Sequence, residues 1–321
     1  MLVTNETKNN KVIPIFFATD DNYIPCLDVA LSSLIENASK DYNYVINILN
    51  TGLKQENMDK VKRLQSSNVI INFCDISEKV ADIKKQLRDI YHFSVTAYYR
   101  LFIESLFPQY DKAIYLDCDI VVLGDISKFY NTDLKDNLVA AIREQVVYNH
   151  PVFSEYAEKC VGVSRENYFN SGILLMNLAE FRKHKIQDKF VDLIRTYNFD
   201  VIDPDQAYLN FLCRNRVKHM PTGWNKESLP EEVEGDLHIV HYALYKKPWQ
   251  YKDVLNGEYF WHYAKKSPFY EKVLKMIEDF DEEKKLAKER ANVEIVEHGL
   301  KVIGLEKTFY NVFLKNNTAT I

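Results

Sequence analysis

Apolar runs alternate with helical stretches in the first quarter of the chain, and this alternation limits the folds available to it. Runs rich in β-branched and aromatic residues lie at Lys11–Ala18, Tyr44–Leu49 and Val69–Phe73. Between them, Tyr23–Asn37 and Met58–Leu64 repeat apolar residues every three or four positions, as helices do. Strands and helices that alternate with short connections predict an α/β fold with a mostly parallel sheet.

The rest of the chain extends this pattern. Further strands are predicted at Ala113–Leu116, Leu138–Ile142, Gly172–Met176 and Leu237–Val240. Further helices are predicted at Lys84–Ile90, Thr96–Phe107, Glu180–Tyr197 and Pro204–Cys213. Pro14 conflicts with the first strand, because proline cannot donate a ladder hydrogen bond, although its neighbours favour a strand. No repeat and no Gly/Ser/Pro-rich linker divides the chain, so we expect one domain over residues 1–270 and a helical extension over 271–321.

The composition argues against several classes of protein. Only 9 of 321 residues are glycine, and the chain has no Gly-rich phosphate-binding loop. The net charge of −5 argues against a nucleic-acid binder. No apolar run is long enough to span a membrane, and Met1–Lys11 is too polar to be a secretory signal. Five scattered cysteines without Cys-x-x-Cys spacing lead us to expect a reduced, cytoplasmic location.

Two carboxylates, Asp117 and Asp119, directly follow the predicted strand Ala113–Leu116. Acids at this spacing can approach one hard divalent cation, such as Mg²⁺ or Mn²⁺, if the backbone turns there. The alternative is that two acids simply end a strand at a solvated turn. Apolar residues on both sides favour the cation site, because a charge in a hydrophobic run is costly unless it is matched.

A histidine and a lysine follow the last predicted strand. His241 could complete the ligands of a cation, and Lys247 could bind a phosphate oxygen. The alternative reading is a core histidine and a surface lysine. Each residue is therefore ambiguous when its segment is considered alone.

Polar residues in the second half of the chain are equally ambiguous. Asp205 and Gln206 could contact a ligand or could only complement the dipole of the helix that begins at Pro204. Asn170 lies in a segment that we predict to be a turn. Arg100, on an aromatic-rich helical stretch, could be a structural ion-pair partner.

In chain order, these segments resemble glycosyltransferase family 8, the retaining enzymes that include bacterial lipopolysaccharide galactosyl- and glucosyltransferases. The resemblance covers about residues 12–250. It rests on six segments, which are weak singly but lie in the expected order. They are Phe17–Tyr23, Thr96–Arg100, Tyr115–Asp119, Phe169–Gly172, Asp205–Gln206 and His241–Trp249.

The resemblance implies a GT-A fold, a single Rossmann-like domain with a mixed sheet that binds a UDP-sugar and Mn²⁺ or Mg²⁺. It implies that the metal ligands are Asp117, Asp119 and His241. It implies that the donor is bound by Ala18, Asp20, Asn22, Arg100, Cys118 and Lys247. The residues around the hexose and its anomeric carbon would be Arg100, Asn170, Asp205 and Gln206. Gln206 would be a poor nucleophile, which favours a front-face mechanism in which a phosphate oxygen takes the acceptor proton.

The chain departs from the family pattern at two places. Leu244 stands where relatives often have glycine, so the local backbone path is expected to differ if it approaches the diphosphate. Arg143 and Glu144 stand where relatives often place an acid near the sugar, which leaves glucose and galactose both open as the donor hexose.

Two other functions fit parts of the sequence. Asp117–Val121 also fits the nucleophile motif of haloacid-dehalogenase-like phosphatases, although more than 110 residues precede it. A non-catalytic relative that binds a sugar nucleotide is the second alternative. The family implies a saccharide or glycolipid acceptor, and no nucleic-acid partner is expected.

The last 38 residues are more basic than the rest of the chain. Residues 284–321 contain seven Lys or Arg and four Glu, a charge of +3, so the remainder carries −8. Val296, Leu300 and Ile303 have helical spacing among basic and aromatic residues. This tail is therefore predicted either to lie on the inner face of an anionic membrane or to pack on the core or a partner chain.

Overall fold

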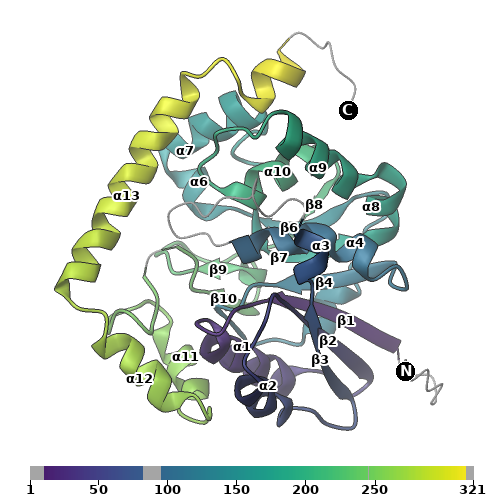
Figure 1. Ribbon diagram of the computed structural model, residues 1–321, viewed down its shortest axis with the longest axis vertical. Helices are drawn as coiled ribbons and strands as arrows, with labels where there is room; N and C mark the ends of the chain where they lie inside the picture. Colours follow the sequence, from purple (N-terminus) through teal and green to yellow (C-terminus); the bar gives the residue numbers. More distant parts are fainter. Residues whose placement is uncertain (1–10, 82–94, 245, 316–321) are drawn as a thin grey trace.

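The computed structural model describes residues 11–81, 95–244 and 246–315, and its centre is a mixed seven-stranded sheet (Figure 1). The strand order is β3-β2-β1-β4-β7-β6-β8. The strands are β1 (Lys11–Ala18), β2 (Tyr42–Asn50), β3 (Val69–Asp75), β4 (Lys112–Leu116), β6 (Val139–Arg143), β7 (Phe169–Asn177) and β8 (Val217–His219). Only β7 runs antiparallel to its neighbours, β4 and β6. The predicted α/β fold with a mostly parallel sheet is confirmed.

Pro14 is accommodated because of where β1 pairs. The strand pairs with β2 along its whole length, Lys11 to Ala18, whereas its pairing with β4 covers only Ile15 and Phe16. Pro14 thus lies outside the ladder with β4, and a missing amide proton interrupts little pairing.

A second, smaller sheet brings distant parts of the chain together. It contains β5 (Ile120–Val122), β10 (Ile239–His241) and β9 (Lys226–Glu227), in the order β5-β10-β9. Since β10 runs antiparallel to β5, His241 is paired with Ile120, the residue after Asp119. The last strand was predicted from the sequence, but its pairing was not.

Helices cover both faces of the main sheet. The remaining elements of the first half are α1 (Ile24–Asn37), α2 (Gln55–Lys62), α3 (Ser77–Val80), the 3₁₀ helix η1 (Val95–Phe102), α4 (Ile103–Leu106), α5 (Ile126–Tyr130), α6 (Gln145–Asn149), α7 (Pro151–Tyr156) and the π-helical η2 (Ala157–Val161). Alternate residues of β1 face opposite cores: Ile15 and Phe17 pack in the core beneath α1, and Phe16 packs in the core beneath α4 and α10.

The second half is also largely helical. Its elements are α8 (Leu178–His184), α9 (Ile186–Thr196), α10 (Pro204–Cys213), η3 (Thr222–Trp224), α11 (Gly257–Ala264), α12 (Tyr270–Glu278), α13 (Glu282–Ile303) and the π-helical η4 (Tyr310–Leu314). The bounds of α10 agree with the prediction. Lys84–Ile90 lies outside the described residues.

Three predicted elements differ from the structure. The single helix Glu180–Tyr197 is two helices, because Lys185 adopts a left-handed conformation with φ of 52° between them. Most of the predicted helix Thr96–Phe107 is the 3₁₀ helix η1. The predicted turn at Phe169–Gly172 is instead the start of β7, where the register with β6 shifts by a bulge. Apolar periodicity does not reveal such local backbone changes.

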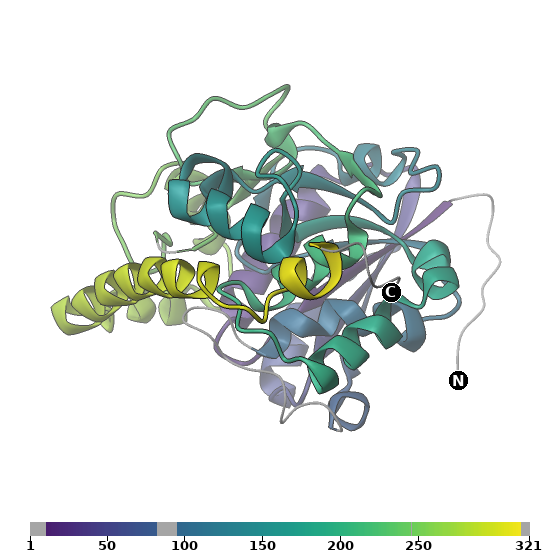
Figure 2. The same ribbon diagram turned by 90° about the horizontal axis from the view of Figure 1, so that it is seen from above.

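The end of the C-terminal tail packs on the core. Helix α13 runs along one side of the molecule, and η4 lies against the body (Figures 1 and 2). Phe309 is 1% exposed, and its ring centroid lies 4.7 Å from that of Phe211. Leu300, which was predicted to share a face with Val296 and Ile303, is instead 55% exposed. No helix in the described part of the chain is both long and apolar enough to cross a bilayer.

Candidate active site

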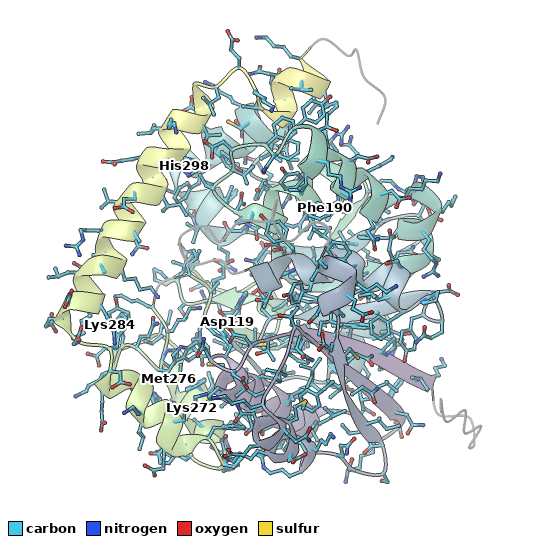
Figure 3. All side chains as sticks on the ribbon, in the orientation of Figure 1. Asp119, Phe190, Lys272, Met276, Lys284 and His298 are labelled. Atoms are coloured by element: carbon cyan, nitrogen blue, oxygen red, sulfur yellow. The ribbon has the colours of Figure 1, made fainter. Side chains whose placement is uncertain are left out.

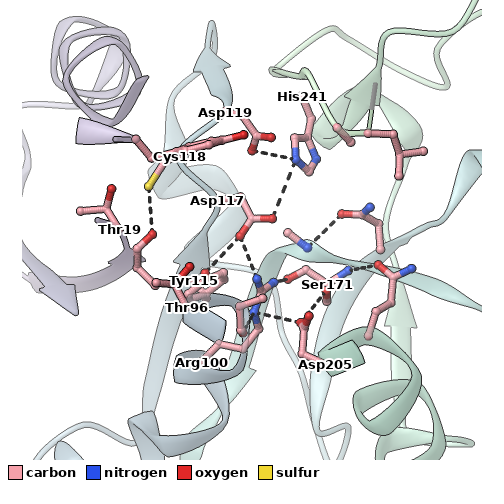
Figure 4. A pocket seen from close by; sticks show the side chains of 18 of the residues that line it. Thr19, Thr96, Arg100, Tyr115, Asp117, Cys118, Asp119, Ser171, Asp205 and His241 are labelled. Carbon is pink, nitrogen blue, oxygen red and sulfur yellow. Dashed lines mark hydrogen bonds and ion pairs between the residues drawn. The ribbon is translucent and has the colours of Figure 1, made fainter. Parts of the chain in front are cut away.

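A cavity of about 290 Å³ lies where the carboxyl ends of β1 and β4 meet the second sheet (Figure 4). It is lined by every residue that the sequence assigned to the site. These are Ala18, Asp20, Asn22, Arg100, Asp117, Cys118, Asp119, Asn170, Asp205, Gln206, His241 and Lys247. The structure therefore brings all of the candidates together, while their individual roles remain predictions.

Asp117, Asp119 and His241 form a compact cluster on one side of the cavity. One ligand atom from each lies within 4.8 Å of the others. The His241 Nε2 atom is 3.2 Å from Asp119 Oδ1 and 3.9 Å from Asp117 Oδ2. The other ring nitrogen, Nδ1, is 2.9 Å from Asn225 Oδ1. If Nδ1 donates its proton to Asn225, the Nε2 lone pair points toward the carboxylates.

Gly172 leaves the space beside this cluster open. A Cβ atom at this position would lie 2.5 Å from His241 Cε1 and 2.6 Å from Asp117 Oδ2. The Asp117 amide donates a hydrogen bond to the Gly172 carbonyl, so the two backbones are already held together. Any side chain at residue 172 would therefore displace two of the three candidate ligands.

We expect Gly172→Ala to weaken divalent-cation affinity by about 10–100-fold, the usual effect of disturbing the residues that orient metal ligands. Titration with Mn²⁺ would measure the change. Gly257→Ala is the matched control, since its Cβ would meet only Val254, at an ordinary distance of 3.5 Å. Unchanged cation affinity in Gly172→Ala would contradict the assignment of this cluster.

Arg100 is buried at the floor of the cavity and joins two carboxylates. Its guanidinium lies 2.9 Å from Asp117 Oδ1 and 3.2 Å from Asp205 Oδ2, and it stacks 4.2 Å above the Tyr115 ring. It also donates to the carbonyls of Ala97 and Ser171. Burial acts to lower the pKa of Arg100, but the two acids outweigh burial and raise that pKa above its ordinary value. Arg100 is thus both an ion-pair partner and a cavity residue.

Ser171 links the start of α10 to β7. Its hydroxyl donates to Asp205 Oδ2 over 3.0 Å, and its amide donates to Gln206 Oε1 over 2.9 Å. Burial raises the pKa of Asp205, and Arg100 opposes this effect. Both side chains, in the first turn of α10, are therefore held in place by β7.

Asp203 was not assigned to the site, yet it orients Gln206. Its Oδ2 atom accepts a hydrogen bond from Gln206 Nε2 over 3.1 Å and another from the Tyr168 hydroxyl, while Oδ1 accepts one from Tyr156. Burial raises the pKa of Asp203 to about 7. The sequence shows that an acid directly precedes Pro204. It does not show that this acid pairs with Tyr156 and Tyr168, because both tyrosines are distant along the chain.

Lys247 is held against Asp119 on the opposite side of the cluster. Its amine is 2.6 Å from Asp119 Oδ2 and donates to the Tyr242 carbonyl over 2.8 Å. Burial acts to raise the pKa of Asp119 and to lower that of Lys247, but the ion pair outweighs burial in both groups. The pKa of Asp119 is therefore lowered and that of Lys247 is raised. Lys247 is only 6% exposed, so the alternative reading of a surface lysine is excluded.

The loop after β1 forms another wall of the cavity. Asp20 Oδ1 accepts hydrogen bonds from the amides of Asn22 and Tyr23, which fixes the loop at the start of α1. The Cys118 thiol donates to the Ala18 carbonyl over 3.2 Å and joins this loop to the segment of the candidate ligands.

Residues outside the assigned set also line the cavity. Glu144 is one of them, and its carboxylate neighbours that of Glu227. Burial raises the pKa of Glu227, and the negative charge of Glu144 raises it further. Burial also raises the pKa of Glu144. Asn225, which holds His241, carried no sequence signal because an isolated asparagine matches no motif.

Leu244 also lines the cavity and has φ of 62°. This left-handed conformation is the one that glycine adopts at little energetic cost. The leucine thus has a backbone geometry compatible with a glycine at this position, so the substitution does not require the different path that we expected.

Comparisons with known proteins agree with this geometry. The sequence pattern of glycosyl transferase family 8 matches residues 14–253. A putative glycosyltransferase of Haemophilus influenzae is 29% identical over 253 residues, which cover 76% of this chain and 74% of the relative. A lipopolysaccharide 1,2-glucosyltransferase of Escherichia coli is 27% identical over 291 residues, with 83% of each chain covered.

Solved structures show the same relationship. The galactosyltransferase LgtC, in complex with donor and acceptor sugar analogues, has a TM-score of 0.66 and 26% identity. That alignment covers 80% of this chain and 96% of LgtC. The bifunctional glycosyltransferase WbbM has a TM-score of 0.70 and 25% identity, although the alignment covers only 53% of its chain. The family match spans about three quarters of the chain, and the solved structures that resemble it have the GT-A fold. The chain therefore belongs to glycosyltransferase family 8.

Proposed function

We propose that this protein is a retaining glycosyltransferase that moves a hexose, glucose or galactose, from a UDP-sugar to a saccharide or glycolipid acceptor. The proposal includes a divalent cation, Mn²⁺ or Mg²⁺, held by Asp117, Asp119 and His241. The observation that carries it is the convergence of these three side chains beside Lys247 in the cavity at the carboxyl ends of β1 and β4.

The chemistry of the three side chains fits such a cation. Two carboxylates and an imidazole are ligands suited to Mn²⁺. Because the His241 Nδ1 atom faces Asn225, its Nε2 atom is left beside two carboxylates at 3.2 and 3.9 Å. A neutral imidazole lone pair there would be repelled by the acids unless a cation lay between them. When bound, the cation would neutralise charge that develops on the departing UDP.

The residues of the chain have separate tasks in this scheme. Lys247, fixed by Asp119 and by the Tyr242 carbonyl, presents a positive charge at the place where a diphosphate would lie. The loop from Ala18 to Asn22, fixed by Asp20, provides a wall for the nucleoside. Arg100, Asn170, Asp205 and Gln206 surround the expected position of the hexose.

The hydrogen bonds around α10 support retention without a protein nucleophile. Asp205 Oδ2 is engaged by Ser171 and Arg100, and Gln206 Oε1 accepts from the Ser171 amide. These contacts hold both side chains in fixed orientations, and the neutral amide of Gln206 is a poor nucleophile. Both residues instead orient the sugar, and a donor phosphate oxygen takes the proton of the acceptor hydroxyl on the face from which UDP leaves.

The proposal also covers where the protein acts in the cell and whether it contacts a membrane. A glycolipid acceptor would bring the protein to the inner face of a membrane from a cytoplasmic location. Leu286, Val293 and Leu300 are exposed along α13 and provide an apolar stripe for such contact. Unchanged liposome binding after truncation at Asp281 would contradict that part of the proposal.

A panel of UDP-glucose, UDP-galactose and a non-uridine control, GDP-mannose, tests the donor and the cation together. Thermal unfolding is measured with and without Mn²⁺, because a ligand at 100 times its Kd stabilises the folded state by about 2.7 kcal/mol. We expect stabilisation by one UDP-hexose only when Mn²⁺ is present, and an α-configured product from an α-configured donor by NMR.

Each outcome of the panel has a distinct meaning. Metal-independent turnover would overturn the cation site, and an inverted product would overturn the mechanism. Binding without hydrolysis or transfer to any acceptor tested would favour a non-catalytic relative. The phosphatase alternative is not favoured, because the match to glycosyl transferase family 8 covers residues 14–253, which include Asp117.

A further inference from the structure

The C-terminal helix α13 contains one buried lysine, Lys288. Lys288 is only 9% exposed, whereas the other basic residues of α13, Lys284, Lys285, Arg290 and Lys301, are exposed or partly exposed. Figure 3 labels Lys284 near the start of α13, at the left edge of the molecule, and Asp119 nearer its centre. A lysine is rarely buried to this extent without a specific partner.

The partner of Lys288 lies in the turn that carries Lys247. The Lys288 amine donates to Gln250 Oε1 over 2.7 Å. The Gln250 and Tyr251 amides both donate to the Lys247 carbonyl, over 2.9 and 3.0 Å. Lys288 is thus hydrogen-bonded to a side chain of the same turn that carries Lys247, whose amine contacts Asp119.

No carboxylate in the described part of the chain lies within ion-pair distance of the Lys288 amine. Its basic neighbours on the helix are bonded elsewhere, Lys284 to the Asp279 carbonyl and Lys285 to Glu282. Burial, with the positive charge of Lys247, lowers the pKa of Lys288 to about 7, and Asp119 acts against this shift. The charged groups that act on the amine are therefore those of the donor site.

We propose that Lys288 is a positioning residue of the donor site, which holds the Lys247 turn through Gln250 and adds its own charge to the field that receives an anionic nucleoside diphosphate. The proposal rests on the proposed function for the identity of the ligand. It makes α13, which the sequence separates from the catalytic domain, a working part of the donor site.

The stability of the protein would reveal what this arrangement costs. The pKa of Lys288 in the folded protein is below that of a free lysine, so the folded state disfavours the charged amine. This cost is fully present below about pH 7 and disappears as the pH rises past the ordinary lysine pKa. Lys288→Met should therefore raise the melting temperature at neutral pH, even though it removes a hydrogen bond.

The affinity for the donor should change in the opposite direction. An anionic donor favours the protonated amine, so donor KM in the natural protein should rise as the pH increases through about 7. If binding raises the pKa of Lys288 by one unit, the linked change in affinity is at most about tenfold. Lys288→Met should raise donor KM by about threefold to tenfold at about pH 6.5, leave kcat nearly unchanged and flatten this pH dependence.

The experiment compares the full chain with Lys288→Met, Gln250→Met and the double variant, by UDP-sugar kinetics, UDP binding and thermal unfolding. Lys285→Met, at a partly exposed lysine on the same helix, is the control and should match the natural protein. If Lys288 acts through Gln250, the effect of the double variant on KM should be smaller than the sum of the two single effects.

Two results would overturn the inference, and neither depends on the fate of the proposed function. One is an unchanged donor KM and pH profile in Lys288→Met, while the natural protein turns over a UDP-sugar. The other is a lower melting temperature together with a fall in kcat, which would indicate a merely structural role. Failure of the natural protein to bind any UDP-sugar would instead count against the proposed function itself.

Discussion

Asp119→Asn is expected to lower the rate of hexose transfer by at least about 10³-fold, because several kcal/mol of charge stabilisation depend on the proposed cation. Asp119 brings a negative charge to two contacts, and an amide lacks that charge. Its Oδ1 atom is 3.2 Å from His241 Nε2, and its Oδ2 atom is 2.6 Å from the Lys247 amine. The variant would lose one charged ligand and leave Lys247 without its buried counter-charge. Transfer kinetics over a range of Mn²⁺ concentrations would measure both losses.

The control for this substitution is Asp111→Asn, whose side chain is 85% exposed in its ion pair with Arg182. It removes the same charge from the protein but lies outside the residues that line the cavity, so transfer should be unchanged. Rates for Asp119→Asn that stay near those of the natural protein at low Mn²⁺ would exclude Asp119 as a ligand. Full rescue at high Mn²⁺ would show that Asp119 contributes affinity but little to the chemical step.

Arg100→Met is expected to have the largest effect on stability, lowering the free energy of unfolding by about 3–5 kcal/mol. Methionine fills part of the volume but leaves Asp117 and Asp205 without the cation that lies 2.9 and 3.2 Å from them. The carbonyls of Ala97 and Ser171 would also lose a donor. Denaturant unfolding would measure the loss, and transfer activity should fall with it because both acids line the cavity.

Arg100→Lys separates the charge of the residue from its geometry. A lysine supplies one positive charge but cannot reach four acceptors in different directions, as the planar guanidinium does. We expect it to recover part of the stability and little of the activity. Arg182→Met is the matched surface control, since that arginine pairs with an exposed acid and should contribute at most about 1 kcal/mol. Equal losses in Arg100→Met and Arg182→Met would contradict a special role for the buried network.

The sequence predicted several of the cavity residues because they lie at the ends of elements that local patterns define. Asp117 and Asp119 follow β4, Asp20 follows β1, and Asp205 begins α10. The carboxyl ends of neighbouring parallel strands meet at one edge of a sheet, so these positions converge once the fold is formed. Residues that support them from elsewhere, such as Asn225, were missed because their partners are distant in the sequence.

Local backbone conformation was predicted less well. Nothing in the apolar spacing of residues 180–197 marks Lys185 as left-handed, since the residues on both sides continue the helical pattern. In the same way, the polar residues Asn170 and Ser171 suggested a turn. They are part of β7, because Asn210, Gln206 and Asp205 satisfy their hydrogen-bonding groups or those of the adjacent backbone.

The sequence by itself determined the order of strands and helices, the family and the set of residues around the cavity, because these depend on local periodicity and on short segments. Only the tertiary structure decided how the C-terminal region takes part. Its basic residues suggested an appendix, yet Phe309 packs in the core and Lys288 reaches the turn of Lys247. The physical reason is that burial and pairing depend on what the fold places opposite a side chain, and a charge count along the chain contains no such information.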